Sequence, residues 1–334
     1  MSKPAKEAST LDLRYMARKR VLTLISPYFG LVSVVVLFYF TTDGRLLSSQ
    51  NLQMVFNQMF PVFLLCLGAV FVWAHGAIDL SVGAAMGCAA IVAANLYNSG
   101  SVALSVFGAI FIALLFGLTN GLLSAVLKLP PFLATFCTMF IGTGIQAYFT
   151  LREVIFINHG VARWEATEID SFPVKIVVIF VAAVVCFVLF QFTVIGKNNT
   201  IIGGNIKAAR FSGIRVNRDR IIAFLISSVF VGLAAFFNVM RINSVTNTFG
   251  AGMQFSVIMS LVFGGMIIGG GKNARISAAI IGPITFILLS NGLQLSGIPT
   301  FYVSLLRGVF FIVIMAITFR KDKNELLPSF SINH

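Results

Sequence analysis

Long hydrophobic runs separated by short polar segments dominate the pattern of this chain. A helix needs roughly 20 apolar residues to cross the hydrocarbon core of a bilayer, and most of the runs reach that length. The pattern therefore predicts an all-α polytopic membrane protein with about ten transmembrane helices. The expected spans are Val21–Phe40, Leu52–Trp73, a third that ends near Tyr97, Val102–Leu127, Phe132–Phe149, Val174–Phe192, Ile221–Met240, Met253–Ile268, Ile276–Leu293 and Phe301–Phe319.

Basic residues set the expected orientation, because Lys and Arg are enriched in cytoplasmic loops. The tail over residues 1–20 is basic, and so is the segment 195–220. Arg320, Lys321 and Lys323 begin a second tail, residues 321–334. We therefore expect both termini in the cytoplasm, on either side of one multi-pass domain, residues 21–320, in the cell (inner) membrane.

Composition agrees with this assignment. The chain has 334 residues, of which 58% are hydrophobic and 10% charged, and its mean hydropathy is +0.94. A soluble domain carries about 25% charged residues, so this chain lacks the charge to cover a water-facing surface. Most of the net charge of +13 falls in loops and tails. Anionic membrane lipid is the partner that this distribution predicts, and nucleic acid is not expected.

Two parts of the chain repeat a short pattern. Asn120-Gly121 precedes Leu129-Pro130-Pro131-Phe132 and a further span, and Asn291-Gly292 precedes Ile298-Pro299-Thr300-Phe301 and a further span. The first pair leads into an inner turn and the second into an outer turn. Equivalent helices of opposite orientation indicate an inverted repeat, which is common in transporters. The predicted halves are residues 52–150 and 221–319.

A basic, polar island interrupts the hydrophobic pattern between residues 195 and 220. Glycines before Asn205 and at Gly213 punctuate a stretch that favours a short helix, Asn205–Phe211. Such a helix between two spans can be held by a soluble partner, so we interpret it as the docking element of a cytoplasmic machine. The residues assigned to this coupling role are Gly204, Asn205, Lys207, Ala208, Ala209, Arg210, Ser212 and Gly213.

The stretch His75–Gly83 is too polar to face lipid and predicts a broken helix. Asp79, with Ser81 and Gly83, suits the start of its second half, where the carboxylate would accept N–H bonds as an N-cap. Direct contact between Asp79 and a solute is the other interpretation, because ionisable groups near the membrane interior are often functional.

Several polar and aromatic side chains lie within the predicted spans. They either hydrogen-bond neighbouring helices or line a pathway for a hydroxylated solute, on whose ring an aromatic side chain could stack. An ionic solute would require a countercharge in the pathway, and the spans contain none securely inside, so a neutral polar solute fits best. The candidate pathway residues are Asn57, Gln58, Phe60, Trp73, Asn120, Phe136, Thr138 and Asn291.

Catalytic and nucleotide-binding motifs are absent from the sequence. The spans contain no carboxylate pair, and no HExxH, GxSxG or CxxC pattern occurs. A phosphate loop at Gly271-Lys272 fails, because Met266 replaces its first glycine and Asn273 replaces its Ser or Thr. We therefore expect no enzyme activity, metal or cofactor in this chain. ATP and Mg²⁺ would bind to a separate ATPase.

The residues together resemble the permease subunits of ATP-binding-cassette importers for monosaccharides, the ribose, xylose, arabinose and autoinducer-furanose group. The resemblance covers residues 50–320 and implies a ten-helix permease that dimerises. It implies a cytoplasmic ATPase, an extracytoplasmic solute-binding protein and alternating access, with Asn205–Ile214 as the coupling region. The motifs on which this resemblance rests are Ile78–Gly83, Asn120-Gly121, Leu129–Thr135, Gly203–Asn205, Ala208–Ile214 and Gly270–Ile276.

Three other functions remain open from the sequence. The same type of permease could carry nucleosides or branched-chain amino acids. For each of these solutes, the second permease copy could be identical to this chain or different from it. An ion-driven secondary transporter would need titratable groups deep in the spans, which are nearly bare of them. A membrane-embedded enzyme would need a catalytic constellation that the sequence lacks.

Overall fold

A computed structural model describes residue 25 and residues 27–150, 153–157, 168–267, 271 and 274–323, with side chains up to residue 313. The predicted tail 1–20 and most of 321–334 lie outside these ranges. Within them six helices are long and apolar enough to cross a membrane, and four shorter apolar helices accompany them. The predicted fold class, an all-α polytopic membrane protein of about ten spans, is confirmed.

The helices follow the predicted order, with ends shifted by a few residues. Strands β1 (Ile155–Phe156) and β2 (Ser244–Val245) form one short antiparallel pair. The helices are Pro27–Thr41, the 3₁₀ turn η1 (Arg45–Leu47), α2 (Ser49–Ala74), α3 (Val82–Asn98), α4 (Val102–Ala125), α5 (Pro131–Thr150), α7 (Phe172–Gln191), α8 (Val194–Gly204), α9 (Ile206–Phe211), α10 (Val216–Ile242), α11 (Met253–Phe263), α12 (Ile276–Leu295) and α13 (Thr300–Lys323).

The predicted eighth span, Met253–Ile268, is wrong in length. Its helix α11 has 11 residues, which is about 16 Å at 1.5 Å per residue, whereas the hydrocarbon core is about 30 Å thick. The helix ends at Gly264, and Gly265 has a positive φ of 86° that stops it. The apolar run continues past this point, so hydropathy alone does not reveal the end of the helix. α11 is a half-helix.

The long helices α2 and α10 form the centre of the molecule and pack against each other. α10 also packs against α3 and α4, while α2 packs against α11 and α12. The outer helices occupy matching positions. α5 contacts α3 and α4, whereas α13 contacts α11 and α12. Each central helix thus packs against helices of the opposite predicted half. Two equivalent halves related by a two-fold axis produce this arrangement. The repeat boundaries 52–150 and 221–319 stay a prediction.

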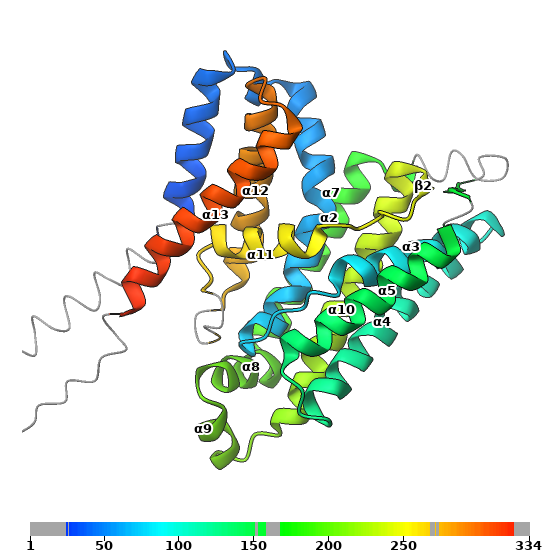
Figure 1. Cartoon of the computed structure of the whole chain (residues 1–334), viewed down its shortest axis with the longest axis vertical. Coiled ribbons are helices and arrows are strands. Elements are labelled where there is room, and N and C mark those ends of the chain that lie inside the picture. Colours follow the sequence, from blue (N-terminus) through cyan, green and yellow to red (C-terminus); the bar gives the residue numbers. More distant parts are fainter. Residues whose placement is uncertain are drawn as a thin grey trace, which may run out of the picture.

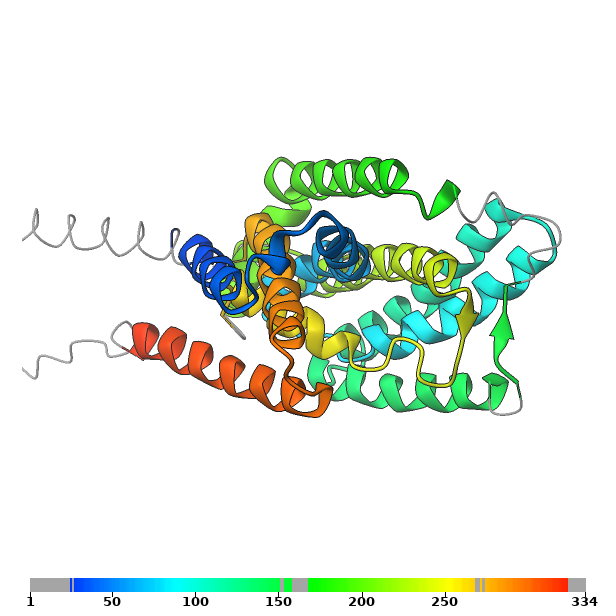
Figure 2. The same ribbon diagram turned by 90° about the horizontal axis from the view of Figure 1, so that it is seen from above.

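Some elements lie at the two ends of this bundle and others along its sides. α8 and α9 lie at one end, below the last turn of α2 and the first turn of α10, and η1 lies at the opposite end (Figure 1). Seen from above, α5 and α13 run along one side of the molecule and α7 along the other (Figure 2). The basic island is therefore held at one end of the bundle.

Small residues let the central helices approach closely. A Cβ added to Gly68 on α2 would come within 2.9 Å of Ser227 on α10, and one added to Gly121 on α4 would come within 3.0 Å of the Ile221 backbone. Without a hydrophobic force between helices in lipid, such close backbone packing is a main source of association. The core of the bundle lies between α2, α3, α4 and α10.

Candidate functional site

The basic island folds into two helices at one end of the bundle. The predicted short helix is present as α9, Ile206–Phe211. The preceding helix α8 was not predicted, because its 11 residues are too short and polar for a span and include three glycines. Both helices lie outside the long apolar segments, where water can reach them (Figure 1).

Both ends of α9 carry specific caps. The Asn205 side-chain oxygen accepts a hydrogen bond from the Ala208 N–H at 3.1 Å. Gly213 has a φ of 78°, and the N–H groups of Gly213 and Ile214 donate to the carbonyls of Arg210 and Ala209. These two bonds form a Schellman motif, which uses glycine because its residue must be left-handed. The caps hold this six-residue helix in one conformation.

One small apolar cluster anchors α9 to its neighbours. Ala209, Ile202 of α8 and Val216 of α10 are buried together, with Ile214 packed against them. Ala209 is the one buried residue of α9. Gly204, Asn205, Lys207, Ala208, Arg210, Ser212 and Gly213 of the predicted coupling set are exposed.

Phe211 lies within the predicted coupling region, but it was not among the residues assigned to the coupling role. Its side chain is 93% exposed at the end of α9, beside Arg210. A large apolar side chain in water, surrounded by polar residues, is typical of a protein contact. The sequence did contain a signal for Phe211, because an aromatic residue stands there inside a segment that is too polar to face lipid.

Three backbones meet where α8 ends. A Cβ on Gly203 would overlap the carbonyl oxygen of Ala74, the last residue of α2, and would come within 2.6 Å of the Gly271 Cα. A Cβ on Gly271 would likewise overlap Ala74 O. We call this contact of Ala74, Gly203 and Gly271 the glycine junction. It joins the basic island to α2 and to the segment between α11 and α12.

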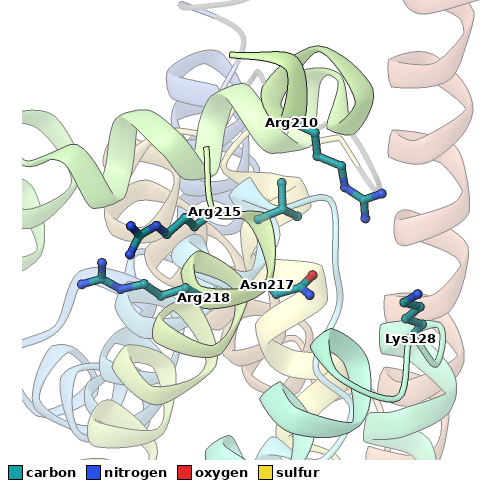
Figure 3. A pocket seen from close by; sticks show the side chains of 6 residues that line it. Lys128, Arg210, Arg215, Asn217 and Arg218 are labelled. Atoms are coloured by element: carbon teal, nitrogen blue, oxygen red, sulfur yellow. The ribbon is translucent and has the colours of Figure 1, made fainter. Parts of the chain in front are cut away.

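A basic cavity of about 530 Å³ lies beside α9. Lys128 comes from the turn after α4, Arg210 from α9, and Arg215, Asn217 and Arg218 from the start of α10, with Val216 between them. Figure 3 shows Arg210, Asn217 and Lys128 around one space, while Arg215 and Arg218 extend side by side in the opposite direction, away from Lys128. None of the lining residues in the described part of the chain is acidic. We call it the basic pocket.

His75 follows the last residue of α2 and is 4% exposed. Neither ring nitrogen has a hydrogen-bond partner among the described residues, and neither has the side-chain amide of buried Asn199 on α8. Burial, together with the positive charge of Arg220, lowers the pKa of His75 to about 4. The imidazole is therefore neutral at physiological pH, at a position between α2, α8 and α10.

The first broken helix is stabilised by a chain of side-chain hydrogen bonds. Asp79 Oδ1 accepts from the Ser81 N–H at 2.8 Å and from its hydroxyl at 2.7 Å. Asn120 on α4 donates to Ser81 Oγ at 2.8 Å, and Thr138 on α5 donates to Asn120 Oδ1 at 2.6 Å. The second half-helix starts at Val82 with Ser81 at the N-cap position, two residues later than predicted for Asp79. Asn120 and Thr138 thus bond α4 to α5.

A second broken segment lies opposite the first, between α10 and α11. Gly250 and Gly252 have φ of 79°, and Gly250 touches Gly83 so closely that a Cβ on either would overlap the other's carbonyl oxygen. Gln146 on α5 donates to the carbonyls of Thr246 and Phe249, each at 2.9 Å. The first turn of α3, directly after the first break, therefore touches the second break at Gly83, one of the predicted cap residues.

Three more of the predicted pathway residues are buried in helix contacts. Asn291 on α12 and Asn51 on α2 exchange two amide hydrogen bonds, at 2.9 and 3.0 Å. Trp73 donates its indole N–H to the Ile267 carbonyl at 2.8 Å. Phe60 packs edge-on against Phe237 with ring centroids 5.1 Å apart.

Asn57 belongs to a charged cluster that the sequence did not reveal. Lys175 on α7 is 1% exposed, donates to Asn57 Oδ1 at 2.7 Å and pairs with Asp170 at 2.8 Å. Arg241 on α10 donates to the Asn57 carbonyl at 3.1 Å. Lys175 lies 118 residues from Asn57, so no local pattern could connect them. The cluster ties α2, α7 and α10 together.

Gln58 and Phe136 keep exposed side chains. Phe136 is 37% exposed on α5 and contacts Phe140 edge-on, with ring centroids 4.8 Å apart. Of the eight pathway candidates, these two are the ones not enclosed by other helices.

Broken helices, polar bonds between helices and an exposed basic helix at one end are the features of a membrane transport permease. A family model described as branched-chain amino acid transport system / permease component matches residues 51–315. The chain belongs to this family.

Relatives resemble the chain over most of its length. It is 29% identical to the ribose import permease protein of Bacillus subtilis (strain 168), over 91% of this chain and 94% of the relative. It is 28% identical to the galactofuranose transporter permease protein of Escherichia coli (strain K12), over 83% and 79%, and 27% identical to the D-allose transport system permease protein of that strain, over 87% and 90%. No solved structure matches the chain.

Proposed function

We propose that this chain is the transmembrane subunit of an ATP-binding-cassette importer and forms the pathway for a neutral sugar. The relatives named for ribose, galactofuranose and D-allose support a monosaccharide. The scarcity of charge in the spans supports an uncharged solute. Alternating access, driven by ATP hydrolysis on a separate subunit, would move the sugar across the membrane.

A branched-chain amino acid is the second candidate solute, because the family description names it, and a nucleoside is a third. Uptake of radiolabelled ribose into cells that carry the complete transporter separates these candidates. Excess unlabelled ribose, galactose or allose should compete, whereas leucine and adenosine should not. Competition by leucine or adenosine alone would reject the sugar assignment.

The observation that carries the proposed mechanism is the exposed, doubly capped helix α9 with Phe211 at its end. A rigid helix held by one buried alanine presents its remaining residues to a partner. We infer that the partner is the cytoplasmic ATPase, which would bind ATP and Mg²⁺. A solute-binding protein would deliver the sugar on the opposite side, and a second permease copy would complete the transporter.

Two variants test this docking. Arg210→Glu reverses the charge beside Phe211, and Phe211→Ala removes the exposed ring without touching the caps of α9. Both should reduce co-purification of the transporter's ATPase, and both should reduce ATP-driven uptake. Lys197→Gln, an exposed change on α8, is the matched control. Normal ATPase recovery and uptake in both variants would reject the docking role.

The orientation is tested separately. Single cysteines at Lys207 on α9 and at Asp43 beside η1 should react with a membrane-impermeant maleimide from opposite sides of sealed vesicles. We expect Lys207→Cys, like both termini, to be accessible from the cytoplasm. Labelling of Lys207→Cys from the outside would contradict the proposal. Purified permease that accumulated solute on an ion gradient without an ATPase would favour a secondary transporter instead.

Phe136 is the pathway candidate that we retain for direct contact with a sugar, because its ring is exposed and stacking on a sugar requires an accessible face. Phe136→Ala should raise the KM for uptake several-fold while leaving the amount of ATPase bound unchanged. Phe180→Ala serves as the comparison, since it removes an exposed ring on α7 that is not a pathway candidate.

A further inference from the structure

Among the residues that the structure describes, no acidic side chain lines the basic pocket to compensate its positive charge. Of the charged residues that line it, all are Lys or Arg. Asp219 is the acidic residue next along α10, and it is buried and accepts a hydrogen bond from Asn198 at 2.8 Å. Arg220 does not line the basic pocket, and its guanidinium donates to the Ser124 carbonyl at 3.0 Å. The pocket is therefore suited to an anion from outside this chain.

The arrangement of the polar groups suits a phosphate. Lys128, Asn217 and Arg210 lie around one space and come from three different segments (Figure 3). An ammonium, an amide and a guanidinium can together donate to several oxygens of one phosphate group, and Arg and Lys are the preferred phosphate donors in proteins.

An apolar groove lies on the segment that directly precedes Lys128 in the chain. It has a volume of about 320 Å³ and lies along the last two turns of α4, lined by Thr119, Leu122, Leu123, Val126 and Leu127. Val126 is 61% and Leu127 64% exposed. The groove ends at the residue before Lys128. A soluble acidic ligand would fill the basic pocket and leave this groove uncovered.

We propose that the basic pocket and the α4 groove together bind one anionic phospholipid. Its phosphate would lie between Lys128, Asn217 and Arg210, and an acyl chain would follow α4. Basic pockets between membrane helices bind anionic headgroups in this way. The lipid would connect the α4–α5 turn to the segment that joins α9 and α10. This inference requires insertion in a membrane. It shares Arg210 with the proposed ATPase contact, so its test uses Lys128, which lies outside that contact.

Binding of phosphatidylglycerol to the purified full-length chain tests the proposal. Native mass spectrometry counts the retained lipids, and thermal unfolding measures the stabilisation. Phosphatidylglycerol should be retained and should raise the unfolding midpoint, and phosphatidylcholine should do neither. Free glycerol 3-phosphate has the phosphate without the acyl chains and should be much weaker. Equal effects of phosphatidylglycerol and phosphatidylcholine would overturn the proposal, and equal effects of glycerol 3-phosphate would assign the pocket to a soluble phosphate.

Lys128→Gln should weaken phosphatidylglycerol binding about fivefold, the loss expected for one cation near an anionic headgroup. Lys128 is exposed with a φ of 55°, so Gln and Arg at this position carry the same backbone strain and should fold. Lys128→Arg should keep binding, and so should Lys197→Gln outside the pocket. Val126→Glu places a charge in the groove and should also weaken binding. A Lys128→Gln variant that lost ATPase but bound the lipid normally would identify a protein contact and refute the lipid site.

Discussion

The two broken segments of this protein are built differently. The first, residues 75–81, is satisfied from its own half, where Asp79, Ser81, Asn120 and Thr138 form one chain of hydrogen bonds. The second, residues 243–252, has three residues with positive φ, and Gln146 of the other half holds two of its carbonyls. The side chains that hold the first break come from α4 and α5 of its own predicted half, whereas the second break is held by Gln146 from the opposite predicted half. A difference of this kind between equivalent positions allows two repeats to move unequally.

The largest expected effect comes from separating α3 from the second break. Gly83→Ala places a methyl group against the Gly250 carbonyl and the Gln254 side chain, and a backbone carbonyl cannot turn away. Overpacking of this kind should reduce the free energy of unfolding by about 3 kcal/mol. Thermal unfolding in detergent measures the loss.

Gly144→Ala on α5 is the matched control, because nothing lies within 4 Å of the added Cβ. It should be neutral or slightly stabilising, since alanine favours helix more than glycine does. Equal unfolding midpoints for both variants would mean that the contact between α3 and the second break is not as tight as described.

A smaller effect should distinguish the breaks from each other. Gln146→Leu leaves the carbonyls of Thr246 and Phe249 without their donors, which should ease opening of the second break by about 2 kcal/mol. Hydrogen exchange should rise over residues 243–252 and stay unchanged over 75–81. Asn120→Leu should give the opposite pattern.

Thr119→Val controls for these changes, because Thr119 is exposed and donates only to the Leu115 carbonyl of its own helix. If Gln146→Leu raised exchange equally in both breaks, they would form one cooperative unit and the proposed difference would be wrong.

The smallest effect depends on pH and should again affect the first break alone, since residues 243–252 contain no titratable side chain. Because the pKa of His75 is lowered to about 4, the unfolded chain binds more protons than the folded chain between about pH 4 and 6.5. Stability therefore falls as pH falls, by about 1 kcal/mol between pH 6.5 and 5.5. His75→Gln should show a smaller fall in unfolding midpoint than the parent chain, and an equal fall would contradict the buried neutral state.

Much of the fold could be predicted from the sequence, because span length and apolar composition are local properties. The ends of α9 were also predictable, since Asn205 and Gly213 are local signals for helix caps. The length of α11 was not, because the apolar run passes through the glycines that end the helix. Hydropathy records composition and does not record backbone conformation.

The candidate site was harder to predict than the fold. Asn120, Thr138 and Asn291 were recognisable as polar residues in spans, but their partners lie on other helices and decide whether they bond a helix or face a solute. Lys175 shows the same limit, since Asn57 and Asp170 become its neighbours only after α2 and α7 pack. The role of α9 stays a proposal, although its conformation is described.

The glycine junction has a mechanical consequence. At Ala74, Gly203 and Gly271 main chain rests directly on main chain, so there are no rotamers between them to absorb a displacement. A displacement of α8 should therefore move the C-terminal end of α2 directly. A methyl group added at Gly203 would force α8 and α2 apart.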